Sequence, residues 1–159
     1  MADLFTTLVL LCALGCGLNS GVFFAFSTFV MQGLARLAPD AGIDAMKAIN
    51  VTAVRPLFMS LLFGTAVLCA IAIVLALIAW DRPGSLLVGI GGAVYIAGAI
   101  LVTMLGNVPL NNALGRIASA DGDGATVWRR YLRDWTRWNH VRTIACTLAM
   151  ALFILALWQ

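Results

Sequence analysis

The stretch PLFMSLLFGTAVLCAIAIVLALIAW, residues 56–80, contains no aspartate, glutamate, lysine or arginine. A helix that crosses a bilayer needs about 20 largely apolar residues, and this run is long enough. Three more charge-free runs occupy residues 4–35, 83–115 and 143–159. Of all residues, 62% are hydrophobic and 11% are charged, whereas a soluble domain is about 25% charged. The chain is therefore predicted to be an integral membrane protein.

We expect an all-α fold, a membrane-embedded four-helix bundle formed by a single domain over residues 1–159. The predicted spans are about 4–30, 57–79, 86–106 and 139–158. The only early charge is Asp3, and a secretory signal begins with basic residues, so the first run is expected to be a span. Short amphipathic helices are expected in the two long loops, at residues 43–54 and from Pro109 onward. A flexible turn is expected at residues 119–125.

The basic residues gather in the two long loops. The first loop holds Arg36, Lys47 and Arg55, and the second holds Arg116, Arg129, Arg130, Arg133 and Arg137. The opposite side has only Arg82. Because cytoplasmic loops carry the excess of lysine and arginine, both long loops are predicted to be cytoplasmic, with both termini outside the cell (inner) membrane. The net charge of +3 is small and confined to loops, which favours membrane lipid over nucleic acid as a partner.

Few polar groups lie inside the predicted spans. Asn19 is near the centre of the first span, and an unpaired amide in hydrocarbon is costly. We expect Tyr95, in the third span, to be its partner. The cysteines also lie in spans: Cys12, Cys16, Cys69 and Cys146. They are expected to pack as small hydrophobic residues, because no second ligand pair has metal-site spacing. No metal site is predicted.

Residues 128–143 are patterned as one helix that leads into the fourth span. At about 100° per residue, one face carries Trp128, Tyr131, Trp135, Trp138, Asn139 and Arg142, and the opposite face carries Arg129, Arg133, Arg137 and His140. The single histidine, His140, is the conventional candidate for a general base, but its face favours an interfacial histidine instead. Arg142 needs an anionic or carbonyl partner if it is buried. Asp134 is expected to pair with Arg130 or Arg137.

Asn107 and Asn111 are spaced i, i+4 in the second long loop. Their amides could face one pocket. Asn107 could equally cap a helix that begins at Pro109, because asparagine is a favoured helix cap. The sequence leaves both roles open.

Two segments, NVPLNN (107–112) and WNHVRT (138–143), resemble the anthrone oxygenase-like membrane family. GVFFAFSTFVM (21–31) and AMKAIN (45–50) also fit, so the resemblance covers nearly the whole chain. It departs from the family pattern at Arg55, where an asparagine is expected. The resemblance implies an oxygenase that converts the activated methylene of an anthrone into a quinone carbonyl with O₂. It also implies that the enzyme uses no metal or flavin cofactor.

Such a reaction requires an aromatic slot for a flat substrate, donors for a developing oxyanion and a base. The resemblance assigns substrate binding to Asn107, Asn111, Trp135 and Trp138. It assigns catalysis to Asn139, His140 and Arg142. Arg142 and the asparagines would be the donors, and His140 would be the base.

Alternatives to an enzyme stay open. The small size and the lack of a convincing base are compatible with a non-catalytic membrane subunit or assembly factor. A small-molecule carrier fits less well, because no ionisable side chain lies deep in a span, where ion-coupled carriers usually have one. The glycine-lined helix faces are compatible with a homo-oligomer, which the sequence neither requires nor excludes.

Overall fold

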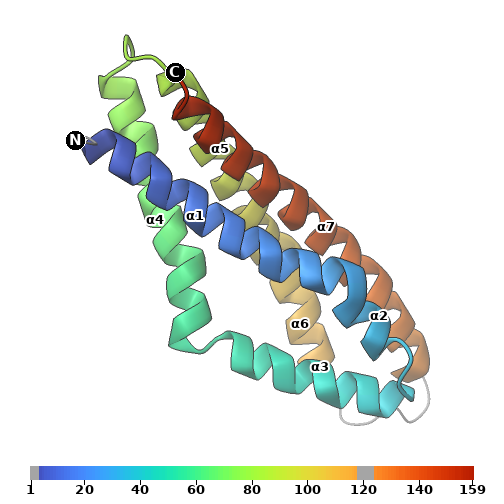
Figure 1. Ribbon diagram of the computed structural model, residues 1–159. Helices are drawn as coiled ribbons and strands as arrows, with labels where there is room; N and C mark the ends of the chain where they lie inside the picture. The colour runs from blue at the N-terminus through green and yellow to red at the C-terminus, as the bar shows by residue number, and fades with distance from the viewer. Residues whose placement is uncertain (1–3, 118–123) are drawn as a thin grey trace.

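The computed structural model describes residues 4–117 and 124–159, and every regular element in these ranges is a helix (Figure 1). Four segments are long and apolar enough to cross a membrane: Leu4–Leu34, Pro56–Ile78, Ser85–Gly115 and Gly124–Ala156. The predicted all-α class is confirmed. The helix predicted from residue 128 leads into the fourth span without a break, and it begins slightly earlier than predicted, at Gly124. The turn expected at residues 119–125 lies almost entirely outside the described residues.

The elements follow in order along the chain. The first long segment consists of α1 (Leu4–Ala25), the π-helical turn η1 (Phe26–Val30) and α2 (Met31–Leu34). Next come α3 (Pro39–Ala53) and α4 (Pro56–Ile78). The third long segment consists of α5 (Ser85–Tyr95), η2 (Ile96–Leu101), η3 (Thr103–Asn107) and α6 (Val108–Gly115), and α7 (Gly124–Ala156) completes the bundle.

The four long helices contact one another in the order α1, α7, α5, α4 around the bundle. Both ends of the chain lie at one end of the bundle, and α3 runs across the other end, next to α6 (Figure 1). As its pattern predicts, α3 is amphipathic: it buries Ile43 and Met46 in a cluster with Trp128, Tyr131 and Trp135 of α7. This cluster holds α3 over one mouth of the bundle.

Pro109 lies in the first turn of α6, as expected. The expectation of a separate helix is wrong, because α6 continues directly from η3. A proline within a helix removes one backbone donor, and its ring crowds the preceding turn. The π-helical geometry of η3, just before the proline, is the kind of local irregularity that accommodates this.

Asn19 and Tyr95 do not pair, so that prediction is also wrong. Asn19 Nδ2 donates to Gly15 O at 2.9 Å and to Thr65 Oγ1 at 3.4 Å. Tyr95 OH donates to Leu62 O at 3.0 Å. Each donor finds a nearer acceptor on α1 or α4, which still avoids the cost of an unpaired donor in apolar surroundings. The cysteines are free and buried, as expected of small hydrophobic residues.

Candidate functional site

A cavity of about 240 Å³ lies at the α3 end of the bundle. Its wall takes residues from α1, η1, α3, α4, η3, α6 and α7 and is mainly apolar. The polar side chains in the wall are Asn50, Thr103, Asn107, Asn111, Trp135 and Arg142. A mainly apolar hollow with a few convergent polar groups is the usual form of a site for a small molecule.

Arg142 is the only charged side chain in the described wall of this cavity, and it is 6% exposed. Its Nη1 donates to Thr103 Oγ1 at 3.2 Å, and its Nη2 donates to Asn139 Oδ1 at 2.7 Å. The guanidinium also lies over the ring of Phe23, 4.2 Å from the centroid, and 5.2 Å from the ring centroid of Trp135. These are attractive cation–π distances.

Among the residues that the structure describes, no carboxylate forms an ion pair with Arg142. Asp134, which pairs with arginines, lies on the outer face of α7. Arg142 Nε is buried and has no hydrogen-bond partner in the described structure. A buried cation needs compensation, and here neutral dipoles and two aromatic faces provide it in part. The site is therefore electrostatically prepared for an anion or for a strong acceptor.

Asn139 holds Arg142 in place from one turn earlier on α7. Its Nδ2 donates to Phe23 O at 2.7 Å and to Ser27 Oγ at 2.8 Å. A side chain that bonds to a helix carbonyl is a known cause of local helix irregularity, and η1 begins close to this contact. With Nδ2 engaged in this way, Asn139 Oδ1 points to Arg142. Asn139 is thus a positioning residue for the guanidinium.

Asn107 and Asn111 connect the third long segment to α7. Asn107 Nδ2 donates to Trp135 O at 3.2 Å. Asn111 Oδ1 accepts from Tyr131 OH and from Trp135 Nε1, each at 2.8 Å. Asn107 makes no capping hydrogen bond at the start of α6, so of its two open roles the pocket role is the one observed. Asn107 Oδ1 is buried without a partner in the described structure, which leaves an acceptor in the same wall as the free donor of Arg142.

The π-helical turns place several of these side chains. Thr103 and Asn107 are the first and last residues of η3, and both line the cavity. Phe26 is the first residue of η1 and is also in the wall. Single π-helical turns are frequent at functional sites, because the wider turn redirects side chains from a regular helical register. Here both segments turn polar or aromatic groups toward one cavity.

Three of the predicted site residues do not line this cavity: Trp138, Asn139 and His140. Asn139 lies behind the wall, where it holds Arg142. Trp138 is 44% exposed, and its indole covers Gly106, where an added Cβ would lie 2.7 Å from Trp138 Cγ. Trp138 lies at the edge of the buried face of α7. Its side chain therefore packs against the third long segment and does not line the cavity. His140 is exposed and lines a shallow groove with Arg129, Arg133 and Arg137. The structure separates His140 from Arg142, as the helical face analysis favoured.

The predicted ion pairs of Asp134 are present on the outer face of α7: Arg130 lies 3.6 Å and Arg137 3.9 Å from its carboxylate. The sequence did not predict a third and closer partner, Arg133, at 2.7 Å. Arg133 donates a hydrogen bond to each carboxylate oxygen. These arginines are well exposed, so the cluster contributes little to stability.

Sequence reasoning missed several wall residues: Phe23, Phe26, Asn50, Phe58 and Thr103. Phe23 and Phe26 belong to GVFFAFSTFVM, and Asn50 belongs to AMKAIN, two of the segments that carry the family resemblance. The family resemblance of these segments was therefore a signal for Phe23, Phe26 and Asn50. Only the packing of α3 and η1 against α7 shows that these residues belong to the site.

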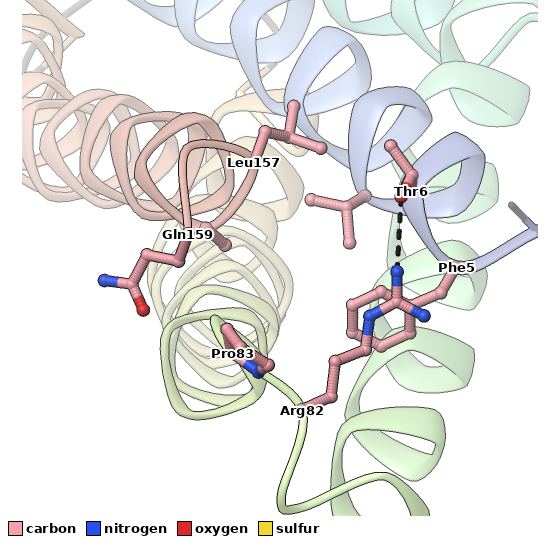
Figure 2. A pocket seen from close by; sticks show the side chains of 8 residues that line it. Phe5, Thr6, Arg82, Pro83, Leu157 and Gln159 are labelled. Atoms are coloured by element: carbon pink, nitrogen blue, oxygen red, sulfur yellow. Dashed lines mark hydrogen bonds between the residues drawn. The ribbon is translucent and has the colours of Figure 1, made fainter. Parts of the chain in front are cut away.

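A second hollow, of about 230 Å³, lies at the opposite end of the bundle, near both chain ends. In Figure 2, Arg82 extends from the loop after α4 toward the start of α1. Its guanidinium lies over the Phe5 ring at 4.4 Å from the centroid, and its Nη2 donates to Thr6 Oγ1 at 3.5 Å. Arg82 thus ties this loop to α1. The buried, carboxylate-free arginine distinguishes the cavity at the α3 end as the candidate site.

The fold and the cavity define an all-α protein of the membrane-bundle type, with an apolar chamber around one buried arginine. A family model described as anthrone oxygenase matches residues 57–152, which is more than half of the chain. The chain therefore belongs to the anthrone oxygenase family. The match includes Asn107, Asn139 and Arg142 and stops short of α1 and α3. No curated protein and no solved structure matches the chain.

Proposed function

We propose that the protein is a membrane oxygenase that oxidises a hydrophobic aromatic ketone of the anthrone type with O₂ at the Arg142 cavity. The observation that carries this proposal is the buried guanidinium. It lies over an aromatic ring, no carboxylate pairs with it in the described structure, and one of its donors is unused. Membership of the anthrone oxygenase family supports the same reaction class.

The chemistry balances with O₂ as the only co-reactant. Loss of a proton from the activated methylene gives a delocalised anion. This anion transfers electrons to O₂, and a carbon–oxygen bond forms to give a hydroperoxide. Loss of water then leaves the carbonyl, so CH₂ and O₂ become C=O and H₂O. We propose that no metal or flavin takes part, because the substrate anion itself supplies the electrons.

Arg142 would act on the first step by stabilising the anion. An opposite charge within hydrogen-bonding range lowers the pKa of an acid by about 1–3 units. The negative charge of the deprotonated ketone resides largely on its oxygen, which is the natural acceptor for Arg142 Nε. A hydroxyl group on the same ring system could donate to Asn107 Oδ1. Each unused polar atom costs about 1–3 kcal/mol while buried, so a hydroxylated aromatic ketone gains from satisfying both.

The described wall of the cavity contains no histidine or carboxylate to take the proton. A neighbouring, more polar hollow of about 610 Å³ shares Asn50 and Asn111 with the cavity and also includes Lys47 and Arg116. We propose that water in this hollow accepts the proton after Arg142 has acidified the substrate. His140, on the far side of α7, then has no part in the step.

We further propose that the four long helices cross the cell (inner) membrane, with the α3 end on the cytoplasmic side. The basis is the excess of lysine and arginine at that end. A membrane-impermeant maleimide should then label an Arg36→Cys variant only in inverted vesicles and an Asp81→Cys variant only in intact cells. The reverse pattern would contradict the orientation.

The test of the function is O₂ uptake and quinone absorbance with purified protein in nanodiscs and an anthrone as substrate. Removing one oxyanion donor costs about 10²–10³ in rate, so Arg142→Gln should lose about two orders of magnitude. The pH at which the rate is half-maximal should also rise, because the substrate is no longer acidified. Arg137→Gln, at an exposed arginine of the same helix, is the matched control and should match the wild type.

Two outcomes would contradict the proposal. One is the same rate and pH profile for Arg142→Gln and the wild type. The other is a wild-type protein that binds the ketone but does not accelerate its oxidation, which would favour the non-catalytic subunit.

A further inference from the structure

An apolar groove of about 800 Å³ lies on the outside of the bundle, between α1, α3 and α4. Figure 1 shows α1 and α4 diverging toward α3, which closes the wide end of the gap. Leu18 and Leu57, in the groove wall, are 61% and 88% exposed. Both belong to helices long and apolar enough to cross a membrane. On the proposed membrane placement, this groove faces lipid.

The groove and the Arg142 cavity are separated by a thin partition. Ile49, Ala53 and Phe58 line both hollows, so each of these side chains has the groove on one side and the cavity on the other. Ile49 and Ala53 are one turn apart on α3, and Phe58 is in the first turn of α4. All three are only half-buried. Ile49 and Phe58 have rotatable side chains, so a change of rotamer in these two would thin the partition beside the small methyl group of Ala53.

Phe58 also connects the partition to the guanidinium. Its ring packs edge-on against Phe23, with centroids 6.4 Å apart and an interplanar angle of 86°. The same Phe23 ring lies beneath Arg142. A flat aromatic molecule that displaced Phe58 would therefore meet an aromatic face and, next to it, the unused donor of Arg142.

We propose that this groove is the entrance through which a flat apolar aromatic ketone passes from the bilayer to the Arg142 cavity, with Ile49, Ala53 and Phe58 as the gate. The proposal rests on the proposed function for the identity of the ligand. The groove wall is apolar except for Thr52 and Arg55. The other opening carries Lys47 and Arg116 and suits water better. An apolar ketone is concentrated in lipid, because transfer of apolar surface out of water is favourable.

The test measures binding, which does not require turnover. An anthraquinone is dissolved in nanodisc lipid, and its association and dissociation are followed by stopped-flow quenching of tryptophan fluorescence, to which Trp135 in the cavity wall contributes.

Ala53→Phe should narrow the gate. Both rates should then fall about tenfold while the dissociation constant changes much less, because a gate raises the barrier in both directions. Phe58→Ala should widen the gate and speed association. Ala70→Phe, at an exposed alanine of α4 outside the groove, should match the wild type.

Equal rates in the wild type, Ala53→Phe and Phe58→Ala would overturn the proposed entrance. So would slowing of the same size in Ala70→Phe. If the wild type binds no quinone, both the entrance and the proposed ligand class fail. If the quinone binds with the expected gate effects and an anthrone is not oxidised, the entrance holds and only the oxygenase function fails.

Discussion

Replacing Asn139 with alanine should destabilise the protein substantially, because this one amide serves three partners. It donates to Phe23 O at 2.7 Å and to Ser27 Oγ at 2.8 Å, and it accepts from Arg142 Nη2 at 2.7 Å. Asn139 is fully buried. Its loss therefore leaves a helix carbonyl and a guanidinium short of partners where water does not easily replace them.

The magnitude follows from the kind of each contact. Neutral hydrogen bonds contribute about 0.5–1.5 kcal/mol each, and one to a charged group contributes about 1.5–3 kcal/mol. Hydrogen bonds between membrane helices average about 0.6 kcal/mol, because the unfolded chain also finds partners in the bilayer. With the neutral contacts near that lower value, the free energy of unfolding should fall by about 3 kcal/mol.

The assay is equilibrium unfolding in mixed micelles, with helix content followed by circular dichroism as the fraction of denaturing detergent increases. Asn112→Ala is the control, because Asn112 is exposed and neighbours the same site. In a double-mutant cycle, Asn139→Ala and Arg142→Met should show a coupling energy of about 1 kcal/mol or more. A loss below about 1 kcal/mol for Asn139→Ala, or additive effects in the cycle, would refute the role of Asn139 in holding Arg142.

Two further predictions concern packing and surface charge. Gly98 faces Ala145 so closely that an added Cβ would overlap its side chain. Gly98→Ala should therefore cost about 1–3 kcal/mol in the same unfolding assay, whereas Gly89→Ala, with nothing within 4 Å of the new Cβ, should be neutral. A neutral Gly98→Ala would show that the helices separate easily there. Asp134→Asn removes only exposed ion pairs and should change the unfolding free energy by less than about 1 kcal/mol; a larger loss would indicate that the arginine cluster is structural.

The sequence did not predict the hydrogen-bond partners of the buried polar side chains. Asn19 was expected to bond to Tyr95, and instead it bonds within α1 and to Thr65 of α4. Asn107 had two open roles, and only its position against α7 decided between them. Hydrogen bonds require agreement of a few tenths of an ångström between segments far apart in the chain. No local pattern encodes that agreement.

The sequence by itself determined the environment of the chain and the faces of its last helix. The length of the charge-free runs predicts membrane helices. The free energy of moving a segment into lipid is approximately the sum of contributions from its own residues, so the sequence alone is sufficient to predict it. The helical period separates Arg142 from His140, because side-chain direction repeats every 3.6 residues. The tertiary structure alone decided that η1, α3 and η3 enclose Arg142. The π-helical turns and the position of α3 depend on contacts between segments that are distant in the chain. These contacts build the cavity around Arg142.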